Sequence, residues 1–463
     1  MGGALMVPVY THALSTSDYG VLDTILRFVT MCMSVVFLGM RQAYQRLYFE
    51  MQTAPNNRTL TSTVVLANFA VAILFLFPLL TVASLAGRNF GAGEFTVLRS
   101  SALVLWVAFE ATYMVGLSHL QVRMRSRLFV IAQSSRLLLL ISLNLTLLRV
   151  FHLGLNGALI GNFAASVLSG LFTAAVLLRA AGIQVSTKYF KEVATFGLPY
   201  IPTVVFVYVI GNADRLALIH FGAVASLGLL ALAAKIGELA LMLFAGPVDN
   251  VWSPYALSVF TDADGPKKIG VMYTKFVAVY VFMALGASLA APIGVSLLAK
   301  TEYAFAARLV PIVAIAWVFN VLTTLSDIGI LISKKTWMKP LATGLVSVIA
   351  VALQFLLTPR FGVIGAAAAT ALSYMVLFLI VRIISQRLYP MMTRPRDFLV
   401  IALAAAIVLL VGAHIIYAYT SLWVCLAMSI FGVTAYGILV LRAGVIETAD
   451  VRWVASRLGE LLK

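Results

Sequence analysis

Three basic side chains stand inside long apolar stretches of the sequence: Arg27, Arg215 and Lys235. Each has an acidic residue close by in the chain, and these acids are Asp23, Asp214 and Glu238. An ionised side chain at the centre of a membrane helix costs about 2.5 to 3.5 kcal/mol on insertion scales, so such residues usually face protein or water. Arginine can hold a phosphate through two parallel hydrogen bonds, and lysine offers a mobile point charge. The three cations therefore indicate a binding site for a phosphate-bearing anion.

The same spacing also permits a structural role. One acid stands four residues before Arg27 and another stands three residues after Lys235, so each can form a local ion pair on one helical face. Asp214 and Arg215 are adjacent, about 100 degrees apart around a helix, and we expect them to pair poorly. The two roles are compatible, because acids that balance an empty pocket can take up a proton or a sodium ion when the anion arrives. The three acids are therefore candidates for charge balance or ion coupling.

The chain that must position these residues is an integral membrane protein. Of its 463 residues, 62% are apolar and only 11% are charged, against roughly a quarter charged in soluble domains. Apolar runs long enough to cross a bilayer recur along the chain and predict about fourteen transmembrane helices. They cover residues 1–14, 20–45, 62–86, 97–118, 128–149, 155–179, 195–220, 227–260, 270–298, 303–332, 339–358, 362–388, 397–419 and 421–441.

The loops between these segments are short, so the sequence leaves no room for a soluble catalytic or nucleotide-binding domain. We therefore expect no enzyme activity, no cofactor, no metal centre and no nucleic-acid partner. The formal net charge of +16 reflects membrane topology instead. When alternate loops are assigned to opposite sides of the membrane, one side receives most of the Lys and Arg residues. Arg136 is counted there with the nearby loop cluster Arg123–Arg127. The positive-inside bias makes that side cytoplasmic, together with both termini.

Self-comparison of the sequence indicates an internal repeat. "FHLGLNGALIG" at 151–161 resembles "PRFGVIGAAAA" at 359–369, an offset of 208 residues that pairs Gly154 with Gly362. The same offset pairs Gly20 with Gly228. It predicts two parallel six-helix lobes. The predicted divisions are a first lobe 1–180, a cytoplasmic linker 181–194, a second lobe 195–390, an extra hairpin 397–441 and an amphipathic cytoplasmic tail 442–463. The first helix is short on this scheme, so we expect further residues upstream of Met1.

The repeat makes two further predictions about opposed charges. It pairs Arg27 with Lys235, which would then face each other across a cavity between the lobes, where a diphosphate could bridge them. It also pairs Arg41 with Asp249, which would close the cytoplasmic mouth as an ion pair. The alternative for the second pair is that Arg41 extends to the lipid headgroups and Asp249 caps a helix broken at Pro247.

Three stretches carry a resemblance to a known family: "VPVYTHALSTSDYGVLDT" at 7–24, "GLPYIPTVVFVYVIGNADRLALIHFGAVASLGLLALAAKIGE" at 197–238 and "VWSPYALSVF" at 251–260. They resemble the polysaccharide export family, which contains the O-antigen flippases, within the superfamily of multidrug, oligosaccharidyl-lipid and polysaccharide exporters. The resemblance extends to about residue 390. The short first helix departs from the family pattern, and the terminal hairpin occurs only in some members.

This resemblance implies a V-shaped pair of lobes around a central cavity in a bacterial cytoplasmic membrane. It implies translocation of an undecaprenyl-pyrophosphate-linked oligosaccharide, a precursor of O-antigen, capsule or exopolysaccharide, with membrane lipids and other glycan-assembly proteins as partners. The alternative is a multidrug antiporter of the related toxin-extrusion family. Cationic drugs favour a negatively charged cavity, whereas the charges found here balance. A membrane-bound polymerase or ligase is disfavoured by the absence of a long outer loop.

Overall fold

The computed structural model describes residues 5–36, 44, 47–48, 54–77, 97–197, 201–333, 335, 337–418 and 422–446. Nearly all of these residues are helical, and no strand occurs among them. Twelve helices in these ranges are long and apolar enough to cross a membrane. Every predicted segment except the first overlaps one of them, and the first corresponds to the short helix α2 (Val7–Ala13). The chain is therefore an all-α, multi-pass membrane protein, as predicted.

The chain divides into two compact units, which are described separately. Unit 2 comprises Val21–Tyr208, and unit 1 combines Gly3–Gly20 with Val209–Lys463. Both divisions fall inside helices, within α3 (Thr16–Val36) and within α11 (Ile201–His220).

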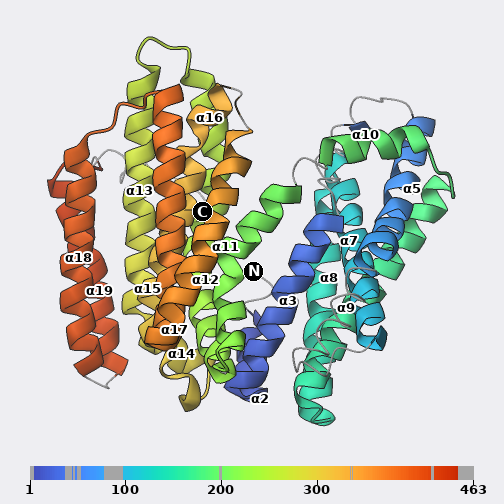
Figure 1. Ribbon diagram of the computed structural model, residues 1–463, viewed down its shortest axis with the longest axis horizontal. Coiled ribbons are helices and arrows are strands. Elements are labelled where there is room, and N and C mark those ends of the chain that lie inside the picture. Colours follow the sequence, from blue (N-terminus) through green and yellow to red (C-terminus); the bar gives the residue numbers. More distant parts are fainter. Residues whose placement is uncertain are drawn as a thin grey trace. The chain divides into compact units, whose positions relative to one another are not determined.

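Unit 2 is built around the carboxyl-terminal part of α3 and a bundle of long helices (Figure 1). These are α5 (Ala54–Val71), α7 (Val97–Val122), α8 (Ser126–Leu145) and α9 (Gly154–Ala181), with π-helical turns η1 (Ala72–Leu76) and η2 (Thr146–Val150). Apolar side chains of α3, α5, α7 and α9 form one buried core. The shorter helix α10 (Thr187–Gly197) lies across one end of the unit, beside α5.

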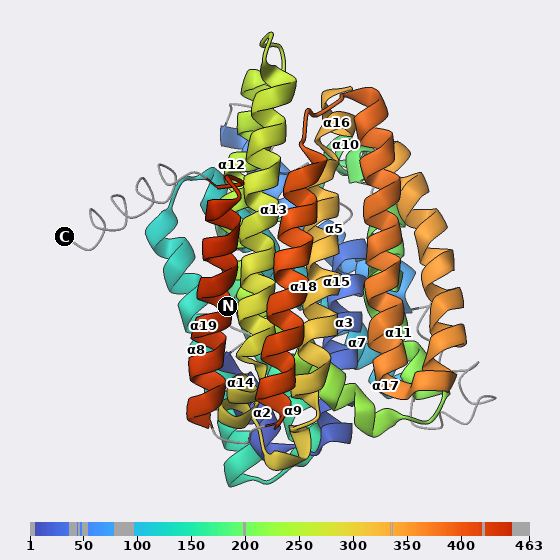
Figure 2. The same ribbon diagram turned by 90° about the vertical axis from the view of Figure 1, so that its left-hand side faces the viewer.

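Besides α2, the start of α3 and the end of α11, unit 1 contains the later helices. They are α12 (Val224–Val259), α13 (Gly265–Leu289), α14 (Ala291–Leu298), η4 (Thr301–Tyr303), α15 (Ala306–Ser326), α16 (Ile328–Ile332), α17 (Met338–Leu388), α18 (Pro395–Ala418) and α19 (Leu422–Arg442). Helices α18 and α19 form the predicted hairpin and pack beside α13 (Figure 2). The core of this unit includes the fully buried side chains of Trp252, Tyr273 and Tyr280.

Helix α17 contains two of the predicted segments, which meet at a sharp bend. Gly362 has φ 57° and ψ −136°, a conformation open to glycine because it has no Cβ. The Gln354 side chain clamps the two arms by donating to the Ala366 carbonyl at 3.0 Å and to Thr370 Oγ1 at 3.1 Å. Gly154, at the start of α9, also has a positive φ, of 53°. The matched glycines Gly154 and Gly362 thus share a positive φ, and the repeat itself stays a prediction.

The amino-terminal residues pack as an elbow against the rest of unit 1. Thr11 Oγ1 donates a hydrogen bond to the Leu298 carbonyl at the end of α14, and Tyr303 Oη donates to the Ser15 carbonyl at 3.0 Å. Gly20 of α3 crosses α12 so closely that a Cβ on Gly20 would overlap the Gly228 backbone, and a Cβ on Gly228 would overlap the backbone of Thr16 in α3. We name this contact the elbow crossing.

Candidate functional site

Arg27 lies on α3 in unit 2 and pairs with the acid one helical turn before it. Its Nε is 2.8 Å from Asp23 Oδ2. The Asp23 side chain is buried, whereas 21% of the Arg27 side chain is exposed. The pair therefore holds the guanidinium in place on a side chain that stays partly exposed.

Asp214 and Arg215 form a buried ion pair on α11, contrary to the expectation that adjacent residues would pair poorly. Arg215 Nη1 lies 2.9 Å from Asp214 Oδ1, and the Arg215 backbone N–H donates to the same oxygen at 2.8 Å. The short aspartate bends back over its own backbone, and the long arginine side chain folds round to meet it. Each side chain is only 5% exposed. A buried charge of either sign is costly without its partner, which explains why the two occur together.

A polar network connects Asp214 to the bend in α17. Thr370 Oγ1 lies 3.4 Å from Asp214 Oδ2, and Gln354 donates to the same threonine hydroxyl. Thr358 Oγ1 in turn donates to Gln354 Oε1 at 2.9 Å. All of these side chains are buried. A change in the charge of Asp214 would therefore alter a hydrogen-bond network that reaches both arms of α17.

Lys235 lies on α12 in unit 1 and pairs with the acid three residues after it. Its Nζ is 3.3 Å from Glu238 Oε2, a longer and weaker contact than those of the two arginines. The Lys235 side chain is 28% exposed. Each of the three cations therefore has an acid from its own helix as a partner. The convergence of the three on one anion stays a prediction, as does the role of the acids.

The structure reveals a charged cluster in unit 2 that the sequence analysis missed. Arg136 is not a loop residue: it lies in the middle of α8, where Nη2 pairs with Glu110 Oε2 of α7. Ser166 of α9 donates to the same carboxylate oxygen at 2.8 Å, and the guanidinium stacks on the Tyr113 ring at 4.4 Å. The feature of the sequence that could have revealed this cluster is the position of Arg136, nine residues beyond the basic loop Arg123–Arg127 and well inside an apolar segment.

The predicted cytoplasmic gate cannot be placed in the same way. Arg41 lies outside the described residues. Asp249 lies in α12, but its side chain is also outside the described part of the structure. The ion pair between them stays a prediction.

The fold is similar to that of a flippase and of a multidrug transporter of known structure. One similar solved structure is a lipid II flippase, MurJ, in an inward closed conformation, with a TM-score of 0.71, 16% identity and 95% of both chains covered. Another is a multidrug resistance MATE family transporter of the MOP superfamily, inward-facing, with a TM-score of 0.66, 14% identity and coverage of 84% of this chain and 94% of that one. At such identities the likeness concerns the fold.

The family is shown by the sequence itself. A family model described as polysaccharide biosynthesis protein matches residues 2–260, more than half of the chain. The chain belongs to that family, which confirms the resemblance stated above. Among curated proteins, none matches the sequence.

Proposed function

We propose that this protein is a flippase that moves an undecaprenyl-pyrophosphate-linked oligosaccharide across the bacterial cytoplasmic membrane by alternating access. The family match over residues 2–260 carries the proposal, because polysaccharide assembly requires such a lipid-linked precursor to change leaflets. The shared fold of a lipid II flippase supports it. The glycan is a precursor of O-antigen, capsule or exopolysaccharide, and other glycan-assembly proteins supply and consume it.

The partly exposed cations Arg27 and Lys235 bind the diphosphate in this proposal. Each is held by a single acid from its own helix, so the empty site stays neutral and avoids the cost of an unpaired charge in the membrane. A diphosphate carries more negative charge than one carboxylate and can replace it as the partner. Arg215 is buried, so it contributes chiefly by holding Asp214 and adding positive potential to the site.

We assign ion coupling to Asp214, with Asp23 and Glu238 as charge-balancing groups. Asp214 is buried, and its Oδ2 faces Thr370 on the bent helix α17. Uptake of a proton or a sodium ion there would weaken the pair with Arg215 and release the constraint on α17. Transport in vesicles that responds to neither a proton gradient nor a sodium gradient would contradict this assignment.

A second candidate function is the export of cationic drugs, favoured by the likeness to a MATE transporter with a TM-score of 0.66. The two functions place opposite demands on the pair Lys235 and Glu238. An anionic cargo needs the lysine and is hindered by the glutamate. A cationic cargo needs the glutamate and is hindered by the lysine.

Neutral substitutions in this pair distinguish the two functions. In a strain whose own copy of the gene is deleted, Lys235→Gln should lower precursor export by roughly tenfold or more, because a charge-assisted contact worth about 1.5 to 3 kcal/mol is lost. Glu238→Gln should preserve or raise export. The readout is lipid-linked precursor retained on the inner leaflet, normalised to the amount of protein in the membrane. If neither substitution changes the retained precursor, and Glu238→Gln alone lowers the export of a cationic dye from the same cells, the drug-export function is favoured.

A further inference from the structure

Helix α10 is held firmly in place by its connection to α5. The Gln184 backbone N–H donates to Ser62 Oγ at 2.9 Å, and Ser62 Oγ donates to the Gln184 carbonyl at 2.7 Å. The Ser186 N–H donates to Thr63 Oγ1 at 3.0 Å. Within α10, Val193 is buried and anchors the helix to the core of unit 2. The opposite face of α10 therefore has a fixed orientation.

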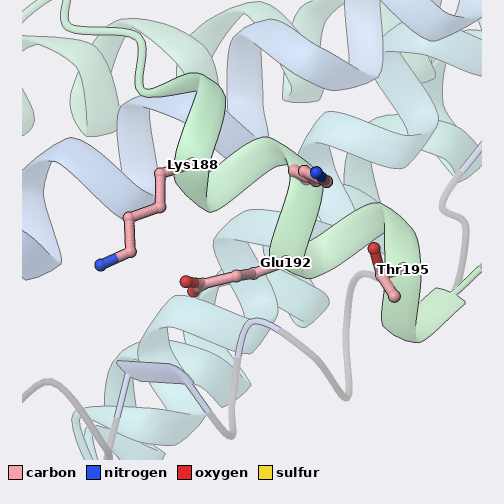
Figure 3. A pocket seen from close by; sticks show the side chains of 4 residues that line it. Lys188, Glu192 and Thr195 are labelled. Carbon is pink, nitrogen blue, oxygen red and sulfur yellow. The ribbon is translucent and has the colours of Figure 1, made fainter.

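That opposite face lines a cavity of about 540 Å³. Among the residues that the structure describes, its lining consists of Lys188, Lys191, Glu192 and Thr195. Lys188 and Glu192 extend from the helix toward the same region (Figure 3). In the described part of the chain, no carboxylate lies within ion-pairing distance of either lysine ammonium. Two cations on one helical face thus line a space large enough to hold a small polar group.

Exposed apolar side chains stand beside these lysines. Ile183 and Val185, in the turn before α10, are 81% and 68% exposed, and Phe190 is exposed on the helix itself. Apolar residues next to lysines on a helix across the end of a membrane bundle are typical of an element at the lipid headgroup level. At that level the abundant anions are phosphates, and each nearby basic residue gains about 1 kcal/mol from them.

We propose that α10 binds the phosphate headgroup of a membrane lipid. Lys188 and Lys191 bind the phosphate oxygens, and Thr195 donates a hydrogen bond from the adjoining turn. The exposed apolar residues before the helix contact the upper part of the acyl chains. Glu192 opposes binding, since its carboxylate lines the same cavity.

Two lipids carry this chemistry: an ordinary anionic phospholipid and the polyprenyl diphosphate of the proposed cargo. Only the second identification rests on the proposed function, and it would make α10 the place where cargo is collected before it reaches Arg27 and Lys235. Binding can be measured without transport, so failure of this proposal and failure of the flippase proposal are distinguishable.

The test is lipid binding by the purified full chain, measured by native mass spectrometry with phosphatidylglycerol and, separately, with undecaprenyl diphosphate. Lys188→Gln with Lys191→Gln should weaken binding of at least one of them by roughly thirtyfold, the combined effect of two charges near a phosphate. Glu192→Gln should strengthen the same binding. The control, Lys267→Gln with Lys335→Gln, removes two exposed lysines of unit 1 and should change neither affinity.

Comparing the two lipids shows which of them supplies the phosphate that the site binds. A loss confined to undecaprenyl diphosphate identifies a cargo-collecting site, and a loss for phosphatidylglycerol identifies a phospholipid site. Lys188→Arg with Lys191→Arg should keep the affinity, and unchanged melting temperatures show that the glutamine variants remain folded. The proposal is overturned if the glutamine variants bind both lipids as tightly as the parent protein, or if the control pair weakens binding to the same extent.

Discussion

Replacing Arg215 with methionine is expected to lower the free energy of unfolding by about 3 to 5 kcal/mol, because it leaves a buried aspartate without its countercharge. Asp214 and Arg215 are each only 5% exposed and are joined by a contact of 2.9 Å. Methionine fills much of the arginine volume, so the loss of packing is small and the unpaired charge dominates. The measurement is the unfolding midpoint of the purified protein in detergent.

Two controls isolate the charge effect. The double variant Asp214→Asn with Arg215→Met removes both charges and should recover most of the lost stability. Lys268→Met breaks the exposed pairs with Asp262 and Asp264 and should shift the unfolding midpoint much less than Arg215→Met does. If Arg215→Met and Lys268→Met have equal effects, the pair on α11 is not the stabilising element described here.

Replacing Gly228 with alanine is expected to destabilise unit 1 by about 1 to 3 kcal/mol or to displace the amino-terminal elbow. The added Cβ would overlap the backbone of Thr16 at the elbow crossing, and backbone atoms cannot move aside as a flexible side chain does. The measurement combines the unfolding midpoint with protease sensitivity of the segment before Gly20.

The matched control lies on the same helix. Gly237→Ala also exchanges a helical glycine of α12, but the nearest atom to its Cβ is 3.6 Å away, an ordinary contact. This variant should be neutral or stabilising by up to about 1 kcal/mol, because alanine favours the helix. If Gly228→Ala is as neutral or stabilising as Gly237→Ala, helix propensity and not the crossing governs this position.

Helix positions were largely predictable because a membrane span needs a long apolar run whatever its neighbours are. The bend of α17 was also visible, since Pro359 and Gly362 interrupt one apolar stretch at the observed turn. The amphipathic helix α10 was missed. It is too short to span a membrane, and its eleven residues were assigned partly to a linker and partly to the next segment.

The partners of the charged residues were harder to predict. The spacing of Arg27 and Lys235 from their acids identified two local pairs. Spacing gave the wrong expectation for Asp214 and Arg215, because their flexible side chains meet despite the angle between them on the helix. It also failed for Arg136, whose partner Glu110 belongs to another helix and can be found only once α7 and α8 are packed together.

The most direct test of the proposed function uses the purified protein reconstituted in vesicles. Undecaprenyl-pyrophosphate-linked oligosaccharide is placed in one leaflet, and its appearance in the other is followed with a glycan-modifying enzyme that cannot cross the membrane. We expect translocation that depends on the protein, is reduced in Lys235→Gln and is unaffected by a cationic drug. Vesicles that export the drug while the lipid-linked glycan stays in its original leaflet would contradict the account.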